Sequence, residues 1–289
     1  MMNLTILILT YNSDIALEKC ISSIDQKIPI IVIENSARKD FKDNIEKKYE
    51  NLKCILNMKN LGFGSAMNIG LKQITTKYVL TLNPDTVLKK DTISNLLLAA
   101  QKLRDFCLLA PSVSNNSIPN YGFLSPSKIE KKTNDNIFEV DYINGFAMFF
   151  NLKKFNDNDF FDENFFLYLE EIDLCKRMRD KDERIFVIKN SIIDHAGGKS
   201  ANTEFRREME YARNWHWMWS QVYFNKKHFN LLKAIKVTII KFCLSFIKSI
   251  LYLLIFNFNK SKIHWLRFNG LLNAYIGKKA FYRSKLDYE

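Results

Sequence analysis

Strand-like and helix-like segments alternate along the first hundred residues, and this alternation constrains the fold more than any other feature. Short runs rich in β-branched residues alternate with longer stretches whose apolar residues recur at helical spacing. We expect strands at 4–10, 28–34, 54–57 and 77–83, and helices at 15–24, 65–74 and 91–103. This pattern predicts βαβ units, and hence an α/β fold with a mainly parallel central sheet and helices on both faces.

The later segments are less regular. Residues 112–136 are rich in Ser, Asn and Pro and are expected to form a surface loop. Beyond it we expect a strand at 137–150 interrupted at Asn144-Gly145, a helix at 167–179, a strand at 185–188 and a long helix at 203–224. We therefore divide the chain into an α/β domain, 1–225, and a helical region, 226–289.

Polar residues stand at the carboxyl ends of the predicted strands, where parallel sheets bind their ligands. Thr10-Tyr11-Asn12 follows the first strand, Glu34 ends the second, and Asn60 follows the third. After the fourth strand comes Asn83-Pro84-Asp85, in which the proline directs the chain out of the sheet. The Asp85 carboxylate is suited to Mg²⁺ or Mn²⁺. Taken alone, Asn-Pro-Asp is also a common turn.

The net charge of +12 is concentrated in the last part of the chain. Residues 211–285 contain Lys and Arg but no Asp or Glu, and the remaining charges leave residues 1–210 neutral. A neutral domain followed by a basic, apolar tail favours attachment to an anionic membrane surface. Nucleic-acid binding is disfavoured because no nucleic-acid motif accompanies the charge.

The most apolar stretch, 231–256, is long enough to span a bilayer but contains four lysines. These are Lys233, Lys236, Lys241 and Lys248. On an ideal helix they share one arc of about 140°, which Thr238 and Ser245 border. We expect a basic amphipathic helix that lies in the membrane interface. The alternative is a helical hairpin that packs on the first domain or on a second subunit of an oligomer.

The five cysteines are widely spaced and include no Cys-x-x-Cys, which argues against a disulfide framework and a zinc knuckle. Isolated thiols in a reducing cytosol are expected. No basic segment precedes the apolar run 5–9 and no small-residue cleavage site follows it, so it is expected to be a strand and not a signal peptide. A peripheral location at the cytoplasmic face of a membrane follows.

Several motifs occur together in a characteristic order. They are Thr10-Tyr11-Asn12, Glu34-Asn35-Ser36, Asn60-Leu61-Gly62-Phe63-Gly64 with Asn68, Leu82-Asn83-Pro84-Asp85, the segments 161–166 and 168–177, and His195. In this order and spacing, over roughly residues 3–225, the chain resembles glycosyltransferase family 2. Within that family it is similar to the rhamnosyltransferase-like branch, in which the Asp-x-Asp position usually reads Asn-Pro-Asp. The resemblance implies a GT-A fold.

The resemblance also implies a site for a nucleoside-diphosphate sugar. Thr10, Asn12 and Glu34 would hold the nucleobase and ribose, and Asp85 would hold Mg²⁺ or Mn²⁺ on the diphosphate. The whole donor-binding set is Thr10, Tyr11, Asn12, Glu34, Asn60, Gly64, Asn68, Asn83 and Asp85. The family usually has Asp where this chain has Glu34, so the carboxylate reaches one methylene further.

Glu170-Glu171-Ile172-Asp173 supplies three acids near the start of a predicted helix. Acids in a first helical turn stabilise the helix dipole, and Asp173 can pair with Arg177 four residues later. The family's catalytic base is the second acid of such a pair, so the resemblance implies that Glu171 accepts the proton. Glu170 and Asp173 are the other candidates.

His195 follows a predicted strand and precedes Gly197-Gly198-Lys199-Ser200. A single histidine is often structural, but the resemblance implies that His195 is a second protein ligand to the metal. The two glycines would let the loop close over the diphosphate, where Lys199 or Ser200 could contact phosphate.

The predicted helix 203–224 contains three tryptophans, which can pack on the domain or stack on acceptor sugars. Trp215 and Trp219 share one face and are the candidate acceptor residues, whereas Trp217 lies on the opposite face.

These expectations describe an inverting, metal-dependent glycosyltransferase. It would move rhamnose or another hexose from a nucleoside-diphosphate sugar to a hydroxyl of a lipid-linked or oligosaccharide acceptor. The setting would be bacterial cell-surface polysaccharide synthesis, such as lipopolysaccharide, at the cytoplasmic face of the inner membrane. One alternative is a catalytically degenerate member that acts as a membrane scaffold. A nucleotidyltransferase is disfavoured because Thr10-Tyr11-Asn12-Ser13 replaces the glycine-rich basic loop expected after its first strand.

Overall fold

The computed structural model describes residues 3–114, 119–124, 131–134, 136–155, 159–196 and 206–284. It contains two compact units. The sheet unit comprises Met1–Leu61, Ser65–Asp162 and Glu171–Ala201. The helical unit comprises Gly62–Gly64, Glu163–Glu170 and Asn202–Glu289, so it combines two short internal segments with the C-terminal part of the chain.

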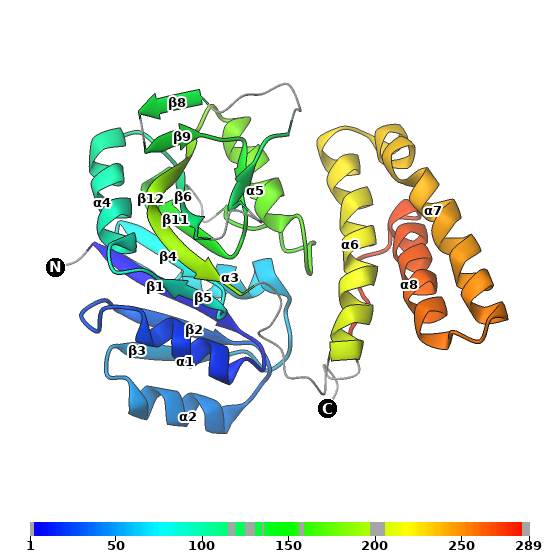
Figure 1. The fold of residues 1–289 in the computed structure, drawn as a ribbon, viewed down its shortest axis with the longest axis horizontal. Helices are drawn as coiled ribbons and strands as arrows, with labels where there is room; N and C mark the ends of the chain where they lie inside the picture. Colours follow the sequence, from blue (N-terminus) through cyan, green and yellow to red (C-terminus); the bar gives the residue numbers. More distant parts are fainter. Residues whose placement is uncertain are drawn as a thin grey trace. The chain divides into compact units, whose positions relative to one another are not determined.

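A ten-stranded sheet forms the centre of the sheet unit, in the order β3-β2-β1-β4-β11-β6-β12-β9-β8 with β5 paired to β12 (Figure 1). Its strands are β1 (Leu4–Thr10), β2 (Ile30–Glu34), β3 (Leu52–Leu56), β4 (Tyr78–Leu82), β5 (Thr86–Leu88), β6 (Leu108–Val113), β8 (Lys131–Asn134), β9 (Ile137–Glu139), β11 (Ala147–Asn151) and β12 (Ile185–His195). Strands β3, β2, β1 and β4 pair in parallel, whereas β11 runs antiparallel to both neighbours. The predicted α/β class is confirmed.

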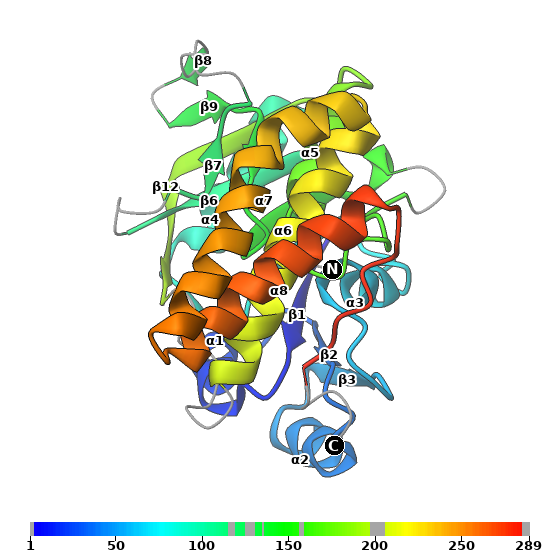
Figure 2. The ribbon, with the colours of Figure 1, turned by 90° about the vertical axis from the view of Figure 1, so that its right-hand side faces the viewer.

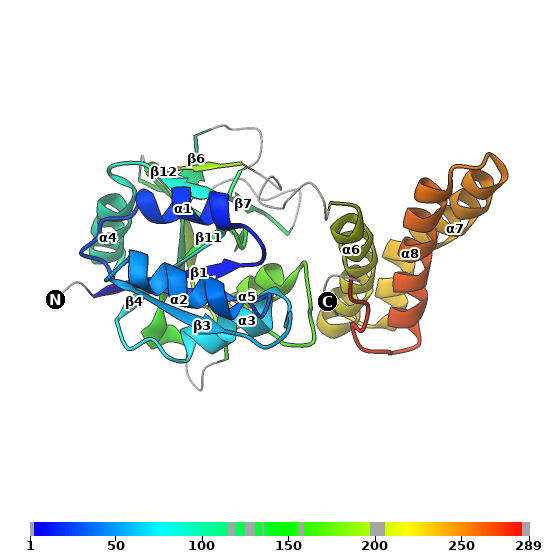
Figure 3. The same ribbon diagram turned by 90° about the horizontal axis from the view of Figure 1, so that it is seen from below.

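The helices that accompany this sheet are α1 (Asp14–Ser22), α2 (Lys39–Lys48), α3 (Phe63–Leu71), α4 (Thr92–Leu103) and α5 (Glu170–Arg179). Strand β1 is buried on both faces. Its Ile6 shares a core with Leu17 of α1. On the other face α3 lies so close that a Cβ at Gly70 would be 2.4 Å from the Leu7 side chain. Figure 3 shows α1 and α3 on opposite sides of β1, so the predicted placement of helices on both faces is confirmed.

Several elements differ from the sequence-based expectations. Helix α2 was not predicted, because Ile45 is its single buried residue and its apolar periodicity is correspondingly weak. Strand β6 was not predicted because Pro111 interrupts its apolar run, and the expected loop 112–136 also contains β7 (Tyr121–Gly122) and β8. Strand β12 is much longer than predicted, and it carries His195 as its last residue.

The helical unit contains α6 (Arg206–His228), α7 (Leu231–Leu254) and α8 (Phe258–Tyr275), which lie side by side (Figure 2). The side chains of Asn230 and Asn257 cap α7 and α8. A Cβ at Gly270 would lie 2.5 Å from the Trp215 carbonyl oxygen, so glycine permits α6 and α8 to approach closely.

Helix α7 packs through small residues and exposes large apolar ones. Its buried residues are Ala234, Thr238, Ser245 and Ser249. The Thr238 hydroxyl lies 2.8 Å from the Tyr275 hydroxyl, and the Ser261 hydroxyl donates to the Ser249 carbonyl at 2.8 Å. Thr238 and Ser245 therefore form a packing seam, whereas the sequence placed them at the border of a polar outer face. Small side chains allow the close approach that these hydrogen bonds need.

The outward residues of α7 include many large aliphatic and aromatic side chains. They include Leu232, Val237, Ile239, Ile240, Leu244, Phe246, Ile247, Ile250, Leu251, Leu253 and Leu254. By length and composition, α7 is the one helix among the described residues that could cross a membrane. Its most apolar window has a mean hydropathy of 1.9, and 17% of that window is buried.

Candidate active site

Thr10 and Glu34 are buried at the adjacent carboxyl ends of β1 and β2. The backbone turns away immediately afterwards, because Asn12 adopts a left-handed φ of 49°. The Asn35 amide donates to the Thr10 carbonyl at 3.0 Å and ties the two strand ends together. The Thr10 hydroxyl is buried without a hydrogen-bond partner among the described residues. Its hydrogen-bonding capacity is therefore unused among the described residues, and its side chain has no exposed surface.

Arg38 holds the Glu34 carboxylate from one side. Its guanidinium donates to Glu34 Oε2 at 3.1 Å and to both carboxylate oxygens of Asp14 at 2.7 and 2.9 Å. Glu34 Oε1 accepts from the Ser36 amide at 2.8 Å and from the Ser36 hydroxyl. The hydrogen bond to Asp14, which is the largest contribution, and the nearby Glu34 charge raise the pKa of Arg38. Glu34 is thus fixed by Ser36 and Arg38 from the loop before α2, and Asp14 of α1 holds Arg38 in place.

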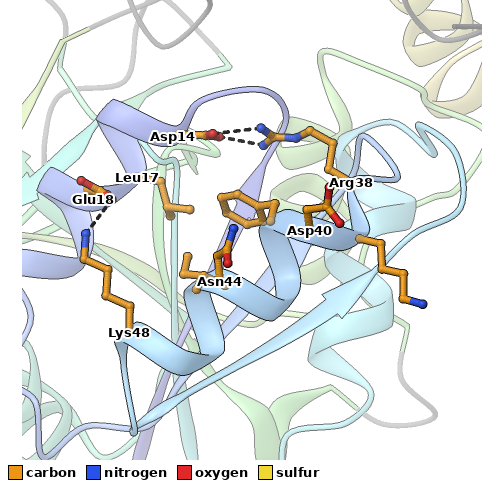
Figure 4. A pocket seen from close by; sticks show the side chains of 10 residues that line it. Asp14, Leu17, Glu18, Arg38, Asp40, Asn44 and Lys48 are labelled. Carbon is orange, nitrogen blue, oxygen red and sulfur yellow. Dashed lines mark hydrogen bonds and ion pairs between the residues drawn. The ribbon is translucent and has the colours of Figure 1, made fainter.

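A groove of about 490 Å³ lies between α1 and α2 (Figure 4). Ion pairs between Asp14 and Arg38 and between Glu18 and Lys48 link the two helices across it. The groove contains no residue of the strand ends that the sequence indicates as the donor site. Its relevance to that site is Arg38, which lines the groove and also contacts Glu34.

Asparagine side chains connect the next strand ends. The Asn35 side-chain amide donates to the Asn60 side chain at 2.9 Å, and the Asn35 side-chain oxygen accepts from the Asn57 side chain at 3.0 Å. Asn68, on α3, pairs with the backbone of Phe161 through both its amide nitrogen and its oxygen, at 2.8 and 3.0 Å. Asn60 and Asn68 therefore shape this region by holding its loops.

Asp85 and His195 face each other at the end of the sheet. Asp85 lies in the turn between β4 and β5, and β12 pairs with β5 so that His195 is opposite Thr86. His195 Nε2 lies 3.4 Å from Asp85 Oδ1, and the Ala196 amide donates to the Asp85 carbonyl at 3.2 Å. The Phe146 ring stacks on the imidazole with the centroids 4.0 Å apart. The sequence motifs 110 residues apart are thus brought together.

The chemistry of this pair suits a divalent cation. Neighbouring ligands of an octahedral ion with metal–ligand distances of about 2.1 Å are about 3 Å apart, close to the Asp85–His195 separation. No group of three or more His, Cys, Asp or Glu side chains that could hold a metal occurs in the part of the chain described. Asp85 and His195 would therefore need oxygen atoms from a ligand or from water to complete the coordination.

Burial raises the pKa of the Cys20 thiol to about 12, and the nearby Asp85 carboxylate adds to the increase. None of the five cysteines is in a disulfide, as the sequence predicts for isolated thiols.

Asp194 points away from the site toward Lys89 and Ser114, whose hydrogen bonds lower its pKa.

The three candidate acids of α5 have different surroundings. Asp173 is fully buried and accepts from Arg177 Nε at 2.9 Å, so the predicted i,i+4 pair is present and explains this residue structurally. Glu170 is also buried. Glu171 is partly exposed. It lies near Tyr142, whose pKa is raised by burial and further by the Glu171 charge. Glu171 is thus the most accessible of the three.

The segment just before these acids is strained and tightly held within the helical unit. Tyr168 and Leu169 both have left-handed φ values, 73° and 69°, which bulky residues rarely adopt. The Phe63 amide donates to the Phe166 carbonyl at 2.9 Å, and a Cβ at Gly62 (φ 83°) would lie 2.2 Å from the same oxygen. The glycine motif is thus needed for packing against this segment. Gly64 is buried in the first turn of α3.

The tryptophans of α6 divide between packing and exposure. Trp215 and Trp219 are 0% and 3% exposed, and their indole nitrogens donate to Asn269 and to the Lys278 carbonyl. These rings are occupied inside the helical unit, so their geometry gives no support to the prediction that they stack on an acceptor. Trp217 is 41% exposed. The loop Gly197-Gly198-Lys199-Ser200 lies outside the described residues.

Arg38 and Phe146 are the site residues that sequence reasoning missed. Neither belongs to a motif, and their roles depend on partners that are distant in the chain or in another strand. An arginine four residues after the buried Glu34 is the one signal that could have indicated such a pair.

Comparison with known proteins identifies the family. The model of glycosyl transferase family 2 matches residues 5–160. The low-salt glycan biosynthesis hexosyltransferase Agl10 of Haloferax volcanii is 25% identical over 210 residues, 66% of this chain and 66% of that protein. The rhamnosyltransferase WbbL of Escherichia coli K12 is 28% identical over 142 residues, 40% of this chain and 54% of that protein. The chain thus spans about two thirds and about half the lengths of these relatives.

Solved structures share the fold. Mannosyltransferase PcManGT from Pyrobaculum calidifontis, solved with GDP-Man and Mn²⁺, has a TM-score of 0.57 at 10% identity, over 94% of this chain and 86% of that one. TarS 1–349 of S. aureus has a TM-score of 0.53 at 13% identity, over 98% and 93% of the two chains. The expected GT-A fold and family are confirmed, and this chain belongs to glycosyl transferase family 2.

Proposed function

We propose that this chain transfers a hexose or deoxyhexose from a nucleoside-diphosphate sugar to a hydroxyl of a membrane-linked glycan, with inversion at the anomeric carbon. The family and the two relatives, a hexosyltransferase and a rhamnosyltransferase, support the reaction class. The observation that carries the proposal is the Asp85–His195 pair, with its 3.4 Å separation, at the carboxyl end of the sheet. Cell-surface polysaccharide synthesis in a bacterium is the proposed setting.

Asp85 and His195 would hold Mg²⁺ or Mn²⁺, which supplies positive charge for the departing diphosphate when bound. The PcManGT structure contains Mn²⁺, which supports this cofactor. Thr10 and Glu34 would bind the nucleoside, Thr10 through its unpartnered hydroxyl and Glu34 through a carboxylate whose position Arg38 and Ser36 fix. Asn83 lies partly exposed in the same turn as Asp85 and would face the sugar nucleotide.

Glu171 would act as the general base. It takes the proton of the acceptor hydroxyl while that oxygen forms a bond to the anomeric carbon. The bond from this carbon to the diphosphate oxygen breaks with its electron pair on the leaving group. Because a single displacement occurs on the face opposite the leaving group, the anomeric configuration inverts. The partial exposure of Glu171 supports this role over buried Glu170 and paired Asp173.

The acceptor would be lipid-linked, and the enzyme would lie on the cytoplasmic face of the inner membrane. Helix α7 supports this through its outward aliphatic and aromatic side chains, together with exposed Lys233, Lys236 and Lys248. Insertion of these lysines at a bilayer centre would cost about 2.5–3.5 kcal/mol each, which favours an interfacial position over a crossing.

Transfer and hydrolysis assays with dTDP-rhamnose, UDP-glucose, UDP-galactose and GDP-mannose, with Mg²⁺ or Mn²⁺, test the proposal. Glu171→Gln should lower turnover by about 10²–10⁴-fold while nucleotide affinity stays close to wild type. Asp85→Asn should weaken metal-dependent nucleotide binding. Glu50→Gln, an exposed acid on the sheet unit, is the matched control and should behave as wild type.

Near-wild-type turnover of Glu171→Gln would exclude that residue as the base. Metal-dependent nucleotide binding without turnover on any donor or acceptor would favour a scaffold over an enzyme.

A further inference from the structure

Two aromatic side chains form a corner in the helical unit just before the candidate acids. The rings of Tyr168 and Trp217 lie 5.4 Å apart at an interplanar angle of 89°. Trp217 is 41% exposed, whereas Trp215 and Trp219 of the same helix are buried. Their two-residue offset directs Trp217 to the side of α6 opposite the packed tryptophans. An aromatic face is therefore available to a ligand beside Tyr168.

The backbone at Tyr168 is held in a costly conformation. Two consecutive left-handed residues other than glycine, Tyr168 and Leu169, cost about 1–3 kcal/mol each, and such strain persists only where the surroundings enforce it. Strain of this kind is concentrated at ligand and catalytic sites. Its position here, immediately before Glu170, indicates that the orientation of this segment matters for function.

Packing on both sides enforces that conformation. Phe165 contacts Tyr223 edge to face at 4.8 Å, and the Ser220 hydroxyl donates to the Leu167 carbonyl at 2.9 Å. The Phe166 ring stacks on His216 with the centroids 4.5 Å apart. The Arg283 guanidinium lies 3.6 Å from the centroid of the Phe166 ring and makes a cation–π contact with it. Each residue of 165–167 is thus fixed by α6 or by the C-terminal segment, and Tyr168 is the next residue of this fixed chain.

The ligand that fits such a corner is a pyranose ring. The axial C–H groups of a pyranose form an apolar face that packs on an aromatic ring, while its hydroxyls remain available for hydrogen bonds. In an edge-to-face pair, one aromatic ring can stack on the face of the pyranose while the second ring contacts the edge of the pyranose. In the sequence, Tyr168 precedes the candidate acid Glu170 by two residues.

We propose that Tyr168 and Trp217 form an acceptor subsite that binds the pyranose ring of the glycan acceptor. This inference rests on the proposed glycosyl transfer for its biological meaning, but carbohydrate binding at the corner is measurable without turnover. Trp217 thus takes the acceptor role that the sequence assigned to Trp215 and Trp219.

Saturation-transfer-difference NMR with the full chain tests the subsite. The probes are the methyl glycosides of glucose, galactose, N-acetylglucosamine and rhamnose at millimolar concentration. Trp217→Ala should weaken binding of the recognised glycoside about tenfold, the equivalent of one stacking contact, and Trp217→Phe should lose less. The matched control is Trp265→Ala, because Trp265 is 47% exposed on α8 of the same unit, and it should bind as wild type.

Three outcomes would overturn the proposal: no binding of any glycoside by the wild type, equal binding by Trp217→Ala, or an equal loss in Trp265→Ala. If Trp265→Ala loses glycoside binding equally and Trp217→Ala also loses binding to phosphatidylglycerol vesicles, Trp217 would be identified as a membrane contact. Nucleotide affinity, measured in parallel, should be unchanged in Trp217→Ala. If no nucleotide sugar is turned over yet the Trp217-dependent glycoside binding is present, the proposed reaction fails and the subsite stands.

Discussion

Helices α4 and α7 differ in how much large apolar side chain they leave exposed. Helix α4, in the sheet unit, buries Leu96, Ala99 and Ala100 in the core beside the strands. Helix α7, in the helical unit, buries Ala234, Thr238 and two serines, and it exposes leucines, isoleucines and Phe246 along its length. The outer face of α4 is suited to water. The outer face of α7 is largely apolar, and its exposure to water is unfavourable.

The difference shows that the two units are stabilised in different ways. Removal of apolar surface from water contributes about 25 cal/mol per Å², and the sheet unit gains this by closing its own core. The helical unit leaves much of its apolar surface outside. Monomeric soluble proteins rarely expose such large contiguous patches, which therefore mark interaction surfaces. The proposed function implies that a membrane surface is the partner of this apolar face.

Truncation of a leucine in each helix gives the largest expected contrast. Leu96→Ala should lower the free energy of unfolding of the sheet unit by about 2–5 kcal/mol, because Leu96 is fully buried and the substitution leaves a cavity. Leu251→Ala, the same change at a 54% exposed position of α7, should cost about 0.5 kcal/mol or less in aqueous buffer. Hydrogen–deuterium exchange of peptides from each unit measures both. Equal costs would show that α7 is packed as an ordinary core helix.

Acid should destabilise the helical unit through His216. Burial lowers the pKa of His216 to about 3, against an ordinary value of 6.5, although its hydrogen bond with the Tyr282 carbonyl opposes the change. Below pH 6.5 the His216 imidazole binds a proton in the unfolded chain but not in the folded chain. The free energy of unfolding therefore falls as the pH falls from 6.5 toward 3. Between pH 6.5 and 5 the loss should be about 2 kcal/mol.

Hydrogen exchange of α6 and α8 peptides at these two pH values measures that loss. His216→Gln removes the titrating group and should show a weaker pH dependence, although its stability at pH 7 is lower. A wild-type protein whose helical unit is equally stable at pH 6.5 and pH 5 would contradict the assignment.

Arg38 should affect nucleotide affinity more than turnover. Because it positions Glu34 without being placed on the reacting atoms, Arg38→Met should weaken the binding of the preferred nucleotide about tenfold and raise KM, with a smaller change in kcat. Calorimetry with UDP, dTDP and GDP measures the affinity. Lys48→Met breaks the exposed pair with Glu18 at the other end of the same groove and should have almost no effect. Similar losses in both variants would show that groove packing matters and that the contact to Glu34 does not.

The smallest effect on folding is expected from polar substitutions on the outer face of α7. The triple variant Ile240→Ser, Ile247→Ser, Leu251→Ser should change the free energy of unfolding by about 0.5 kcal/mol or less per site. Its binding to phosphatidylglycerol vesicles should fall strongly, because each apolar side chain contributes about 1.5–3 kcal/mol when it is buried. Cosedimentation measures this.

The matched control replaces exposed apolar residues of the sheet unit, Ile15, Met58 and Leu98, by serine. That variant should sediment with vesicles as the wild type does. A triple α7 variant that still binds vesicles fully would place the membrane contact elsewhere or exclude it.

The sequence by itself determined the α/β class, the position of β1 and the order of the site motifs. These depend on local causes: the period of apolar residues, and turn chemistry such as that of Asn83-Pro84-Asp85 at a strand end. Asp173 and Arg177 were also predictable, because helical geometry places residues four apart side by side.

Only the tertiary structure decided which partners distant residues have. Asp85 lies opposite His195, and Arg38 donates to the Glu34 carboxylate. Trp215 and Trp219 are buried, whereas Trp217 is exposed. The small residues of α7 face the interior of the helical unit. The reason is physical. A helical wheel gives the relative directions of side chains, but the surface against which each face packs is supplied by segments far away in the chain, and the sequence pattern of one helix contains no information about them.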